Sequence, residues 1–201
     1  MKLYYTPGAC SQAPHIALNE LDLSAEPVKV DLGTHTLPDG SDYRRVNPKG
    51  YVPLLELDDG TRLAETQVIL QYLADRKPGT LAPPAGTAER WRLMELLAFL
   101  SAEVHKGFGP LWNPQTPPEV RERAVQALGT RFEYLAQTLV REPWLMGQQF
   151  SVADAYLFVL LNWTKMHKVD LTPWPALKEF QARVAARPAV QATLRTEGFL
   201  K

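Results

Sequence analysis

The chain has 201 residues, of which 45% are hydrophobic and 22% charged, and its 22 basic and 22 acidic side chains give a formal net charge of +0. This balance provides no electrostatic reason to expect nucleic acid or an anionic membrane as a partner. No run approaches the roughly 18 apolar residues that span a bilayer. The single cysteine excludes an intramolecular disulfide, and the N-terminus lacks a signal-peptide pattern, so we expect a cytoplasmic protein.

Strand and helix patterns alternate over about the first 76 residues. Short β-rich runs predict four strands, at residues 2–5, 26–31, 52–57 and 61–64. A helix is predicted from Ser11 onward, between the first two strands, which makes those strands parallel. A second helix opens at Glu65-Thr66, and its predicted apolar face consists of Val68, Ile69, Tyr72 and Leu73. The order β-α-β-loop-β-β-α is that of a thioredoxin-like domain.

The chain changes character at residues 79–86, a Pro- and Gly-rich segment that predicts a linker between a domain at 1–78 and an all-helical domain at 87–201. Helices are predicted over residues 87–108, 117–141, 155–163 and 189–195, and over a segment that starts at 173 or 175 and ends near 187. Ser151 and Asp154 have the spacing of a capping box ahead of the third of these helices. Four aromatic side chains are interpreted as core residues, with the last also a candidate wall for a site: Trp91, Phe99, Tyr156 and Trp163.

Cys10 is the first candidate for chemistry, because it stands between the first strand and the first helix. Backbone N–H groups at a helix start favour negative charge, so this position predicts a thiol that readily becomes a thiolate. The alternative is a small buried hydrophobic residue, which is common for a free cysteine. Ser11 follows Cys10 in place of a C-x-x-C motif, which excludes a dithiol redox pair within this chain.

Three further places carry candidate chemistry, each with a plainer alternative. A cis Val52-Pro53 bond would leave the Val52 backbone to pair with a peptide-like ligand as an added strand, although a plain turn also fits. Glu65 and Thr66 can hold an α-amino and an α-carboxylate group at a helix start, or simply cap it. His105 can polarise a nearby thiol, or serve only as a cation at a helix end. The four histidines and one cysteine show no metal-ligand spacing.

These features occur in the order found in glutathione transferases, and the chain resembles their bacterial beta class over nearly its whole length. The motifs that carry the resemblance lie at residues 2–11, 13–16, 47–50, 52–53, 105–108 and 151–158. The resemblance implies a thioredoxin-like N-terminal domain, a helical C-terminal domain and a homodimer. It also implies glutathione as the co-substrate, a small electrophile as the second substrate, and a role in detoxification.

The resemblance also assigns roles to individual positions. Cys10 would face the glutathione sulfur, with which it can form a mixed disulfide, and His105 would approach the same sulfur. The implied glutathione-binding positions are Ser11, His35, Tyr51, Val52, Pro53, Glu65, Thr66, Glu103 and Lys106. Among these, Glu103 would reach the ligand of the neighbouring subunit. Trp163 would help to wall the pocket for the electrophile, and no metal is implied.

Three interpretations of function follow. The first is a transferase that directs the glutathione thiolate to an electrophile in an apolar cleft, and the second is a glutaredoxin-like enzyme that exchanges glutathione with disulfides through Cys10. The third is a binding or regulatory module without catalysis. It rests on three departures from the family's pattern, namely Tyr51 in place of Gln, His35 in place of Lys and Ala98 in place of Asn.

Overall fold

The computed structural model describes residues 1–200, and its N-terminal half is a four-stranded sheet with helices on one face. The strands are β1 (Lys2–Tyr5), β2 (Glu26–Lys29), β3 (Leu54–Glu56) and β4 (Arg62–Ala64). They lie in the order β2-β1-β3-β4, with β1 and β2 parallel and the other pairs antiparallel. The helices of this half are α1 (Gln12–Glu20) and α2 (Thr66–Arg76), with a short 3-10 turn at Tyr43–Arg45 in the long loop. The predicted element order is confirmed, although the last three strands are shorter than predicted.

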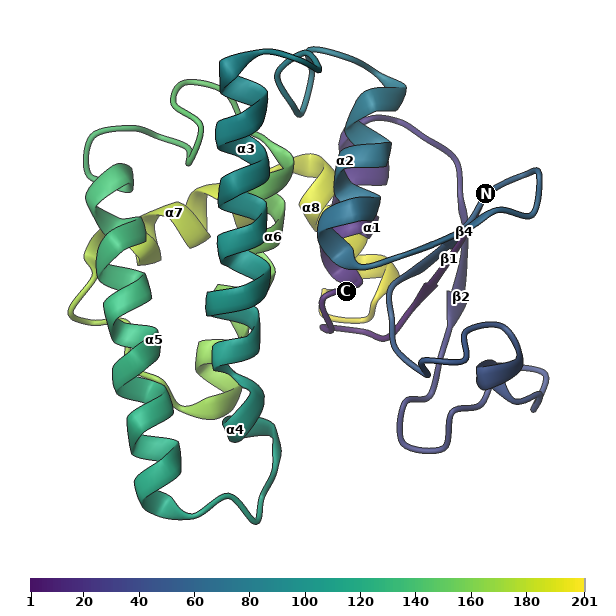
Figure 1. The fold of residues 1–201 in the computed structure, drawn as a ribbon, viewed down its shortest axis with the longest axis horizontal. Coiled ribbons are helices and arrows are strands. Elements are labelled where there is room, and N and C mark those ends of the chain that lie inside the picture. The colour runs from purple at the N-terminus through teal and green to yellow at the C-terminus, as the bar shows by residue number, and fades with distance from the viewer. Residues whose placement is uncertain (201) are drawn as a thin grey trace.

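The C-terminal half is all-helical (Figure 1). Its elements are α3 (Ala88–Phe99), the π-helical stretch η2 (Leu100–His105), α4 (Gly109–Trp112), α5 (Pro118–Leu139), α6 (Val152–His167), α7 (Pro175–Ala185) and α8 (Pro188–Thr196). The helix predicted over residues 87–108 is therefore regular only as far as Phe99, because the following turns are π-helical. The short helix α4, which begins at Gly109, follows the π-helical stretch. Among residues 1–200, none of these helices is both long enough and apolar enough to cross a membrane.

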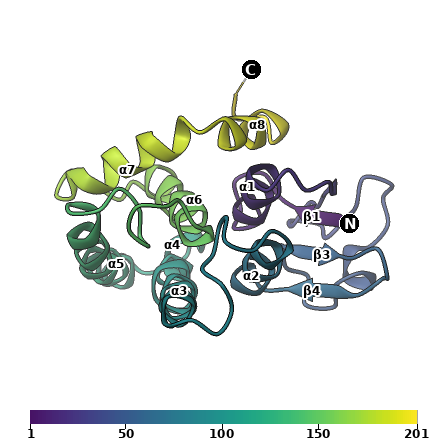
Figure 2. The same cartoon turned by 90° about the horizontal axis from the view of Figure 1, so that it is seen from above.

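A large hydrophobic core joins the two halves. Figure 2 shows α1 and α2 between the sheet and the helical domain, with α6 on the far side of α1. The side chains of α6 are buried from Val152 to Thr164 with the exception of Asn162, and one buried cluster extends from Leu3 in β1 to Val190 in α8. Since the apolar surface is shared, the sheet and the helices stabilise each other.

Two predictions of buried side chains are wrong. Val68 is 43% exposed, and the buried face of α2 includes Leu70 in its place. The buried face of α2 is therefore rotated around the helix axis relative to the face that the sequence predicted. Trp91, expected in the core, is 62% exposed on α3.

The capping box at the start of α6 is confirmed. Asp154 has no exposed surface, and its Oδ2 accepts hydrogen bonds from the backbone N–H of Ser151 at 2.8 Å and from the Ser151 hydroxyl at 2.7 Å. Its Oδ1 accepts from the backbone N–H of Leu145 at 2.8 Å. Burial raises the pKa of Asp154 to about 6, although these hydrogen bonds act in the opposite direction.

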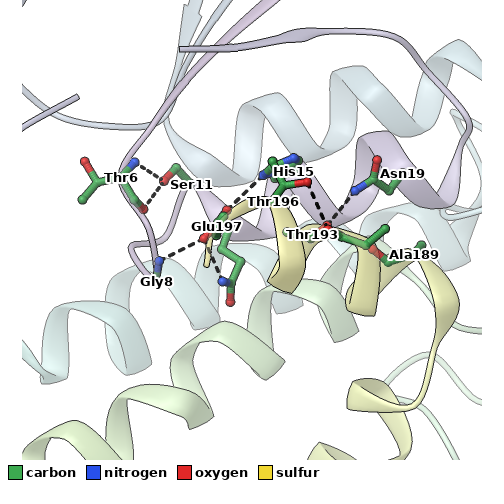
Figure 3. A network of polar contacts seen from close by, with 11 residues as sticks. Thr6, Gly8, Ser11, His15, Asn19, Ala189, Thr193, Thr196 and Glu197 are labelled. Atoms are coloured by element: carbon green, nitrogen blue, oxygen red, sulfur yellow. Dashed lines mark hydrogen bonds and ion pairs between the residues drawn. The ribbon is translucent and has the colours of Figure 1, made fainter. Parts of the chain in front are cut away.

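Glu197, just beyond α8, connects the end of the chain to the loop before α1 (Figure 3). Its side chain is fully buried, and Oε2 accepts hydrogen bonds from the Gly8 backbone N–H at 3.0 Å and from Gln12 Nε2 at 2.8 Å. Oε1 lies 3.0 Å from Nδ1 of His15. One carboxylate from the helical domain therefore holds three groups on either side of Cys10.

We expect Glu197→Ala to lower the free energy of unfolding by about 2–4 kcal/mol, because buried donors that lose their acceptor cost about 1–3 kcal/mol each. The measurement is urea unfolding followed by circular dichroism. Thr196→Ala is the matched control, since within residues 1–200 the exposed Thr196 hydroxyl bonds only to the Ala192 carbonyl of its own helix. Equal midpoints for the two variants would contradict the prediction.

Candidate active site

A cavity of about 430 Å³ lies between the sheet domain and the helical domain. The sheet domain lines it with polar and backbone groups, including those of Cys10, Val52, Glu65 and Thr66. The helical domain lines it with His105 and Lys106 and with large apolar side chains, namely Trp112, Trp163 and Met166. The cavity therefore places a thiol next to a polar cradle on one side and an aromatic wall on the other.

Cys10 lies in a loop that is held by its neighbour. Ser11 is fully buried, and its hydroxyl both accepts from the Thr6 backbone N–H at 3.1 Å and donates to the Thr6 carbonyl at 3.2 Å. The Cys10 thiol donates to the Val52 carbonyl at 3.4 Å. Because Ser11 is the N-cap of α1, Cys10 stands one residue outside the helix.

The expected thiolate is wrong for the ligand-free protein. The Cys10 residue keeps part of its surface exposed, yet burial raises the pKa of its thiol. The hydrogen bond with the Thr66 hydroxyl and the backbone N–H groups of Cys10 and Ser11 lower this pKa, but by less than burial raises it, and the nearby charge of Glu65 raises it further. Desolvation thus raises the pKa of Cys10 by more than the N–H groups at the helix start lower it. Without a ligand the side chain is a neutral thiol.

The backbone around Val52 is open to a ligand. The Val52-Pro53 bond is cis, as predicted. The Tyr51 carbonyl accepts from the Tyr43 hydroxyl and from Asn47 Nδ2, both at 2.8 Å, which holds this turn in place. The Val52 N–H donates to no acceptor within residues 1–200, although Val52 lines the cavity. An extended ligand can therefore use this N–H as a strand would.

Glu65 and Thr66 begin α2 at the cavity. Glu65 has φ +69°, a left-handed conformation that costs a non-glycine residue about 1–3 kcal/mol and is often found at functional sites. Its exposed carboxylate pairs with Lys49 Nζ at 3.1 Å. Thr66 is 6% exposed, and its hydroxyl lowers the pKa of the Cys10 thiol. The carboxylate and the hydroxyl of this pair both belong to the cavity wall.

His105 lies at the end of η2, where α6 holds its ring. Nδ1 is 2.7 Å from the hydroxyl of Tyr156, and the Trp163 ring meets the imidazole edge-on with centroids 4.8 Å apart. Burial, with a smaller contribution from the charge of Lys106, lowers the pKa of His105 to about 4. The imidazole is therefore neutral at physiological pH and can act as a hydrogen-bond donor.

The other candidate residues divide into two groups. Tyr51, Pro53, Lys106 and Trp163 line the cavity, and the Trp163 indole N–H also donates to the Gly8 carbonyl at 2.8 Å. Ser11, His35 and Glu103 do not line it: Ser11 bonds within its own loop, the His35 ring lies against Gly50, and Glu103 pairs with Arg131 at 2.7 Å. Within residues 1–200, no group of three or more His, Cys, Asp or Glu side chains is placed to hold a metal ion.

Tyr156, Trp112 and Met166 are cavity residues that the sequence analysis missed. Tyr156 was interpreted only as a core residue, and it is fully buried, but its hydroxyl reaches His105. Its spacing to Trp163 offered a signal, because residues seven apart lie on one face of a helix after about two turns. Trp112 and Met166, 47% and 56% exposed, had no such signal.

Comparison with known proteins identifies the family of both domains. Residues 8–76 match the family model of the glutathione S-transferase N-terminal domain, and residues 99–188 match that of the C-terminal domain. The glutathione S-transferase GstA of Escherichia coli O157:H7 is 44% identical over 98% of this chain and 99% of its own length.

Two solved structures are similar over nearly their whole length. A bacterial beta class glutathione S-transferase of Sphingomonas chungbukensis is 45% identical, with a TM-score of 0.95 and all of both chains covered. A sphingomonad glutathione S-transferase complexed with glutathione is 44% identical, with a TM-score of 0.94 over 98% of this chain and 99% of that one. On these matches of both domains, together with the sheet, the helices and the cavity between them, the chain belongs to the glutathione S-transferase family and resembles its bacterial beta class.

Proposed function

We propose that the cavity binds glutathione along the sheet domain and an apolar electrophile along the helical domain, and that the protein joins them through the glutathione sulfur. The observation that carries this proposal is the cavity itself. In it an unpaired Val52 N–H, the Glu65-Thr66 helix start and the Cys10 thiol lie opposite an aromatic wall. A tripeptide thiol fits the first set of groups, and a planar apolar molecule fits the second.

On the sheet side, two parts of glutathione would have matching groups. The Val52 backbone would pair with the cysteinyl residue, and Glu65 and Thr66 would hold the α-amino and α-carboxylate groups of the γ-glutamyl end. Cys10 would then lie at the glutathione sulfur. By resemblance, Tyr51, Pro53 and Lys106, which line the cavity, would also contact glutathione. Ser11 and His35 would act from outside the cavity lining, and Glu103 would reach the glutathione bound to the neighbouring subunit.

The proposed chemistry is thiolate stabilisation and positioning. His105 is neutral, and it would donate a hydrogen bond to the glutathione sulfur as the thiol proton leaves to solvent. The thiolate would form a C–S bond with the electrophile, which would lose its leaving group with the electron pair of the broken bond. Trp112, Trp163 and Met166 would hold the electrophile against the sulfur.

Intact mass after incubation with oxidised glutathione tests the placement of Cys10. Attack of the Cys10 sulfur on the disulfide would give one glutathione adduct and release one reduced glutathione. A single adduct that reductant reverses, and that Cys10→Ala lacks, is expected. A wild-type protein with no adduct, and with no glutathione binding by calorimetry, would overturn the proposal in favour of a module that does not catalyse.

We expect Cys10→Ala to retain conjugation with an activated aryl halide, within about tenfold of the wild-type rate, since a neutral thiol contributes at most one hydrogen bond of about 0.5–1.5 kcal/mol. Disulfide exchange should be lost entirely. The measurement is the initial rate with each substrate. Retained exchange in this variant would contradict a role for Cys10, whereas lost conjugation with intact binding would assign the sulfur chemistry to Cys10 itself.

The raised pKa of Cys10 favours conjugation over glutaredoxin-like exchange, because exchange depends on an accessible thiolate.

We further propose a cytoplasmic homodimer that serves detoxification, with domains at 1–78 and 87–201 and a linker at 79–86. The homodimer is supported by exposed apolar side chains on α2, α3 and α5, namely Val68, Trp91 and Tyr134. Sedimentation at micromolar concentration tests the assembly.

A further inference from the structure

Tyr156 has a buried hydroxyl next to His105. The function proposed above assigns no role to this hydroxyl. It lies in the second turn of α6, has no exposed surface, and contributes to the cavity wall. Its hydroxyl is 2.7 Å from His105 Nδ1, while the two rings stand at 85° to each other. A hydroxyl buried this deeply needs a partner, and the imidazole is the partner with a short direct contact.

Two residues of α6 together determine how the His105 ring lies. Tyr156 binds the ring at Nδ1, and Trp163, two helical turns further on, packs edge-on with centroids 4.8 Å apart and an angle of 75°. Trp163 is itself held by its hydrogen bond to the Gly8 carbonyl. The imidazole therefore has one hydrogen-bonded nitrogen and one packed edge, which leaves Nε2 as its other polar group.

The direction of the hydrogen bond decides which nitrogen carries the proton. Burial raises the pKa of the Tyr156 phenol, so the hydroxyl keeps its proton and can donate it. The hydroxyls of Ser101 and Thr66 lower the pKa of this phenol, but by less than burial raises it. An unprotonated imidazole nitrogen accepts more strongly than a hydroxyl, so donation to Nδ1 is favoured, and the imidazole proton then resides on Nε2.

We propose that Tyr156 is a positioning residue that holds His105 in the neutral Nε2–H tautomer, with its only N–H available to the substrate sulfur. The catalytic consequence rests on the proposed function, while the tautomer follows from the contacts alone. Without the Tyr156 hydroxyl, Nδ1 would compete with Nε2 for the proton, and the ring would lose the contact that orients it.

Nitrogen NMR of the four histidine side chains at pH 7 tests the tautomer, with His105→Gln identifying the signals of His105. In the wild type we expect Nδ1 to be unprotonated and Nε2 protonated. In Tyr156→Phe we expect averaged signals of both tautomers. A wild-type imidazole with the proton on Nδ1 would overturn the inference without any variant, and so would an unchanged spectrum in folded Tyr156→Phe.

Steady-state kinetics test the proposed effect of Tyr156 on catalysis. Tyr156→Phe is expected to lower kcat by about tenfold while the KM for glutathione stays the same. In a protein that already carries His105→Phe, adding Tyr156→Phe should lower kcat no further. Tyr72→Phe is the matched control, because Tyr72 on α2 does not line the cavity and its hydroxyl makes no hydrogen bond within residues 1–200. Equal losses with and without His105 would overturn the inference. An unchanged kcat in the single His105→Phe variant would instead contradict the proposed function of His105, and the NMR result distinguishes the two.

Discussion

Asp154→Ala is expected to lower the free energy of unfolding by about 3 kcal/mol or more at pH 7. The side chain is fully buried and accepts from the Ser151 N–H, the Ser151 hydroxyl and the Leu145 N–H. Each donor left without an acceptor costs about 1–3 kcal/mol, and the loss falls at the start of α6. Since α6 lies at the centre of the shared core and carries Tyr156 and Trp163, both domains should unfold together at a lower urea concentration.

The pH dependence of the same site provides the discriminating measurement. The pKa of Asp154 in the folded protein, about 6, lies above its ordinary value of 3.8, so the folded state binds this proton more tightly. The stabilising contribution is therefore complete below about pH 4 and is lost as the pH rises through 6. The difference in stability between wild type and Asp154→Asn should change over this window. A constant difference from pH 4 to pH 7.5 would show that Asp154 does not titrate there.

His105→Phe is expected to lower kcat for conjugation by about 10²-fold, the typical cost of removing one preorganised donor to a developing negative charge. The KM for glutathione should change little, because the Val52 backbone and the Glu65-Thr66 pair are proposed to supply binding. The bound thiol should also have a higher pKa once its donor is gone, so the rate profile should move to higher pH. Steady-state rates with an activated aryl halide between pH 5.5 and 9 measure both effects.

His105→Gln is the matched control for this prediction, because its side-chain amide retains an N–H donor and should recover most of the lost rate. The wild-type rate should show no fall between pH 8 and 5.5 from protonation of His105, whose pKa is only about 4. A bell-shaped profile with a limb near pH 6.5, abolished in His105→Phe, would instead identify His105 as a general base.

Local patterns were sufficient for the element order. The short β-rich run at Lys2–Tyr5, the helical spacing after Ser11 and the Ser151–Asp154 capping box each depend on neighbours within a few residues, and the structure confirms them. Burial was harder to predict, because Val68 and Trp91 are apolar yet point away from the core that forms only when α2 and α3 pack. Apolar character alone does not say which side of a helix meets the rest of the chain.

The protonation state of Cys10 was not readable from its position. The sequence placed it correctly between β1 and α1, where N–H groups favour a thiolate, but the elements that enclose it come from distant parts of the chain. The Val52 carbonyl and the Thr66 side chain approach from the same domain, and the helical domain closes the other side of the cavity. Desolvation by these groups reverses the expected direction of the pKa shift.

The sequence by itself determined the family resemblance and the thioredoxin-like order of elements, because motif spacing and local periodicity are properties of the chain. For the same reason it identified the candidates Cys10, Val52, Glu65, Thr66 and His105. What only the tertiary structure decided is how these groups meet. The neutral imidazole of His105, its contact with Tyr156 and the aromatic wall of the cavity arise from residues about 50 positions apart. Their electrostatics depend on the burial that folding creates, and no local pattern encodes that burial.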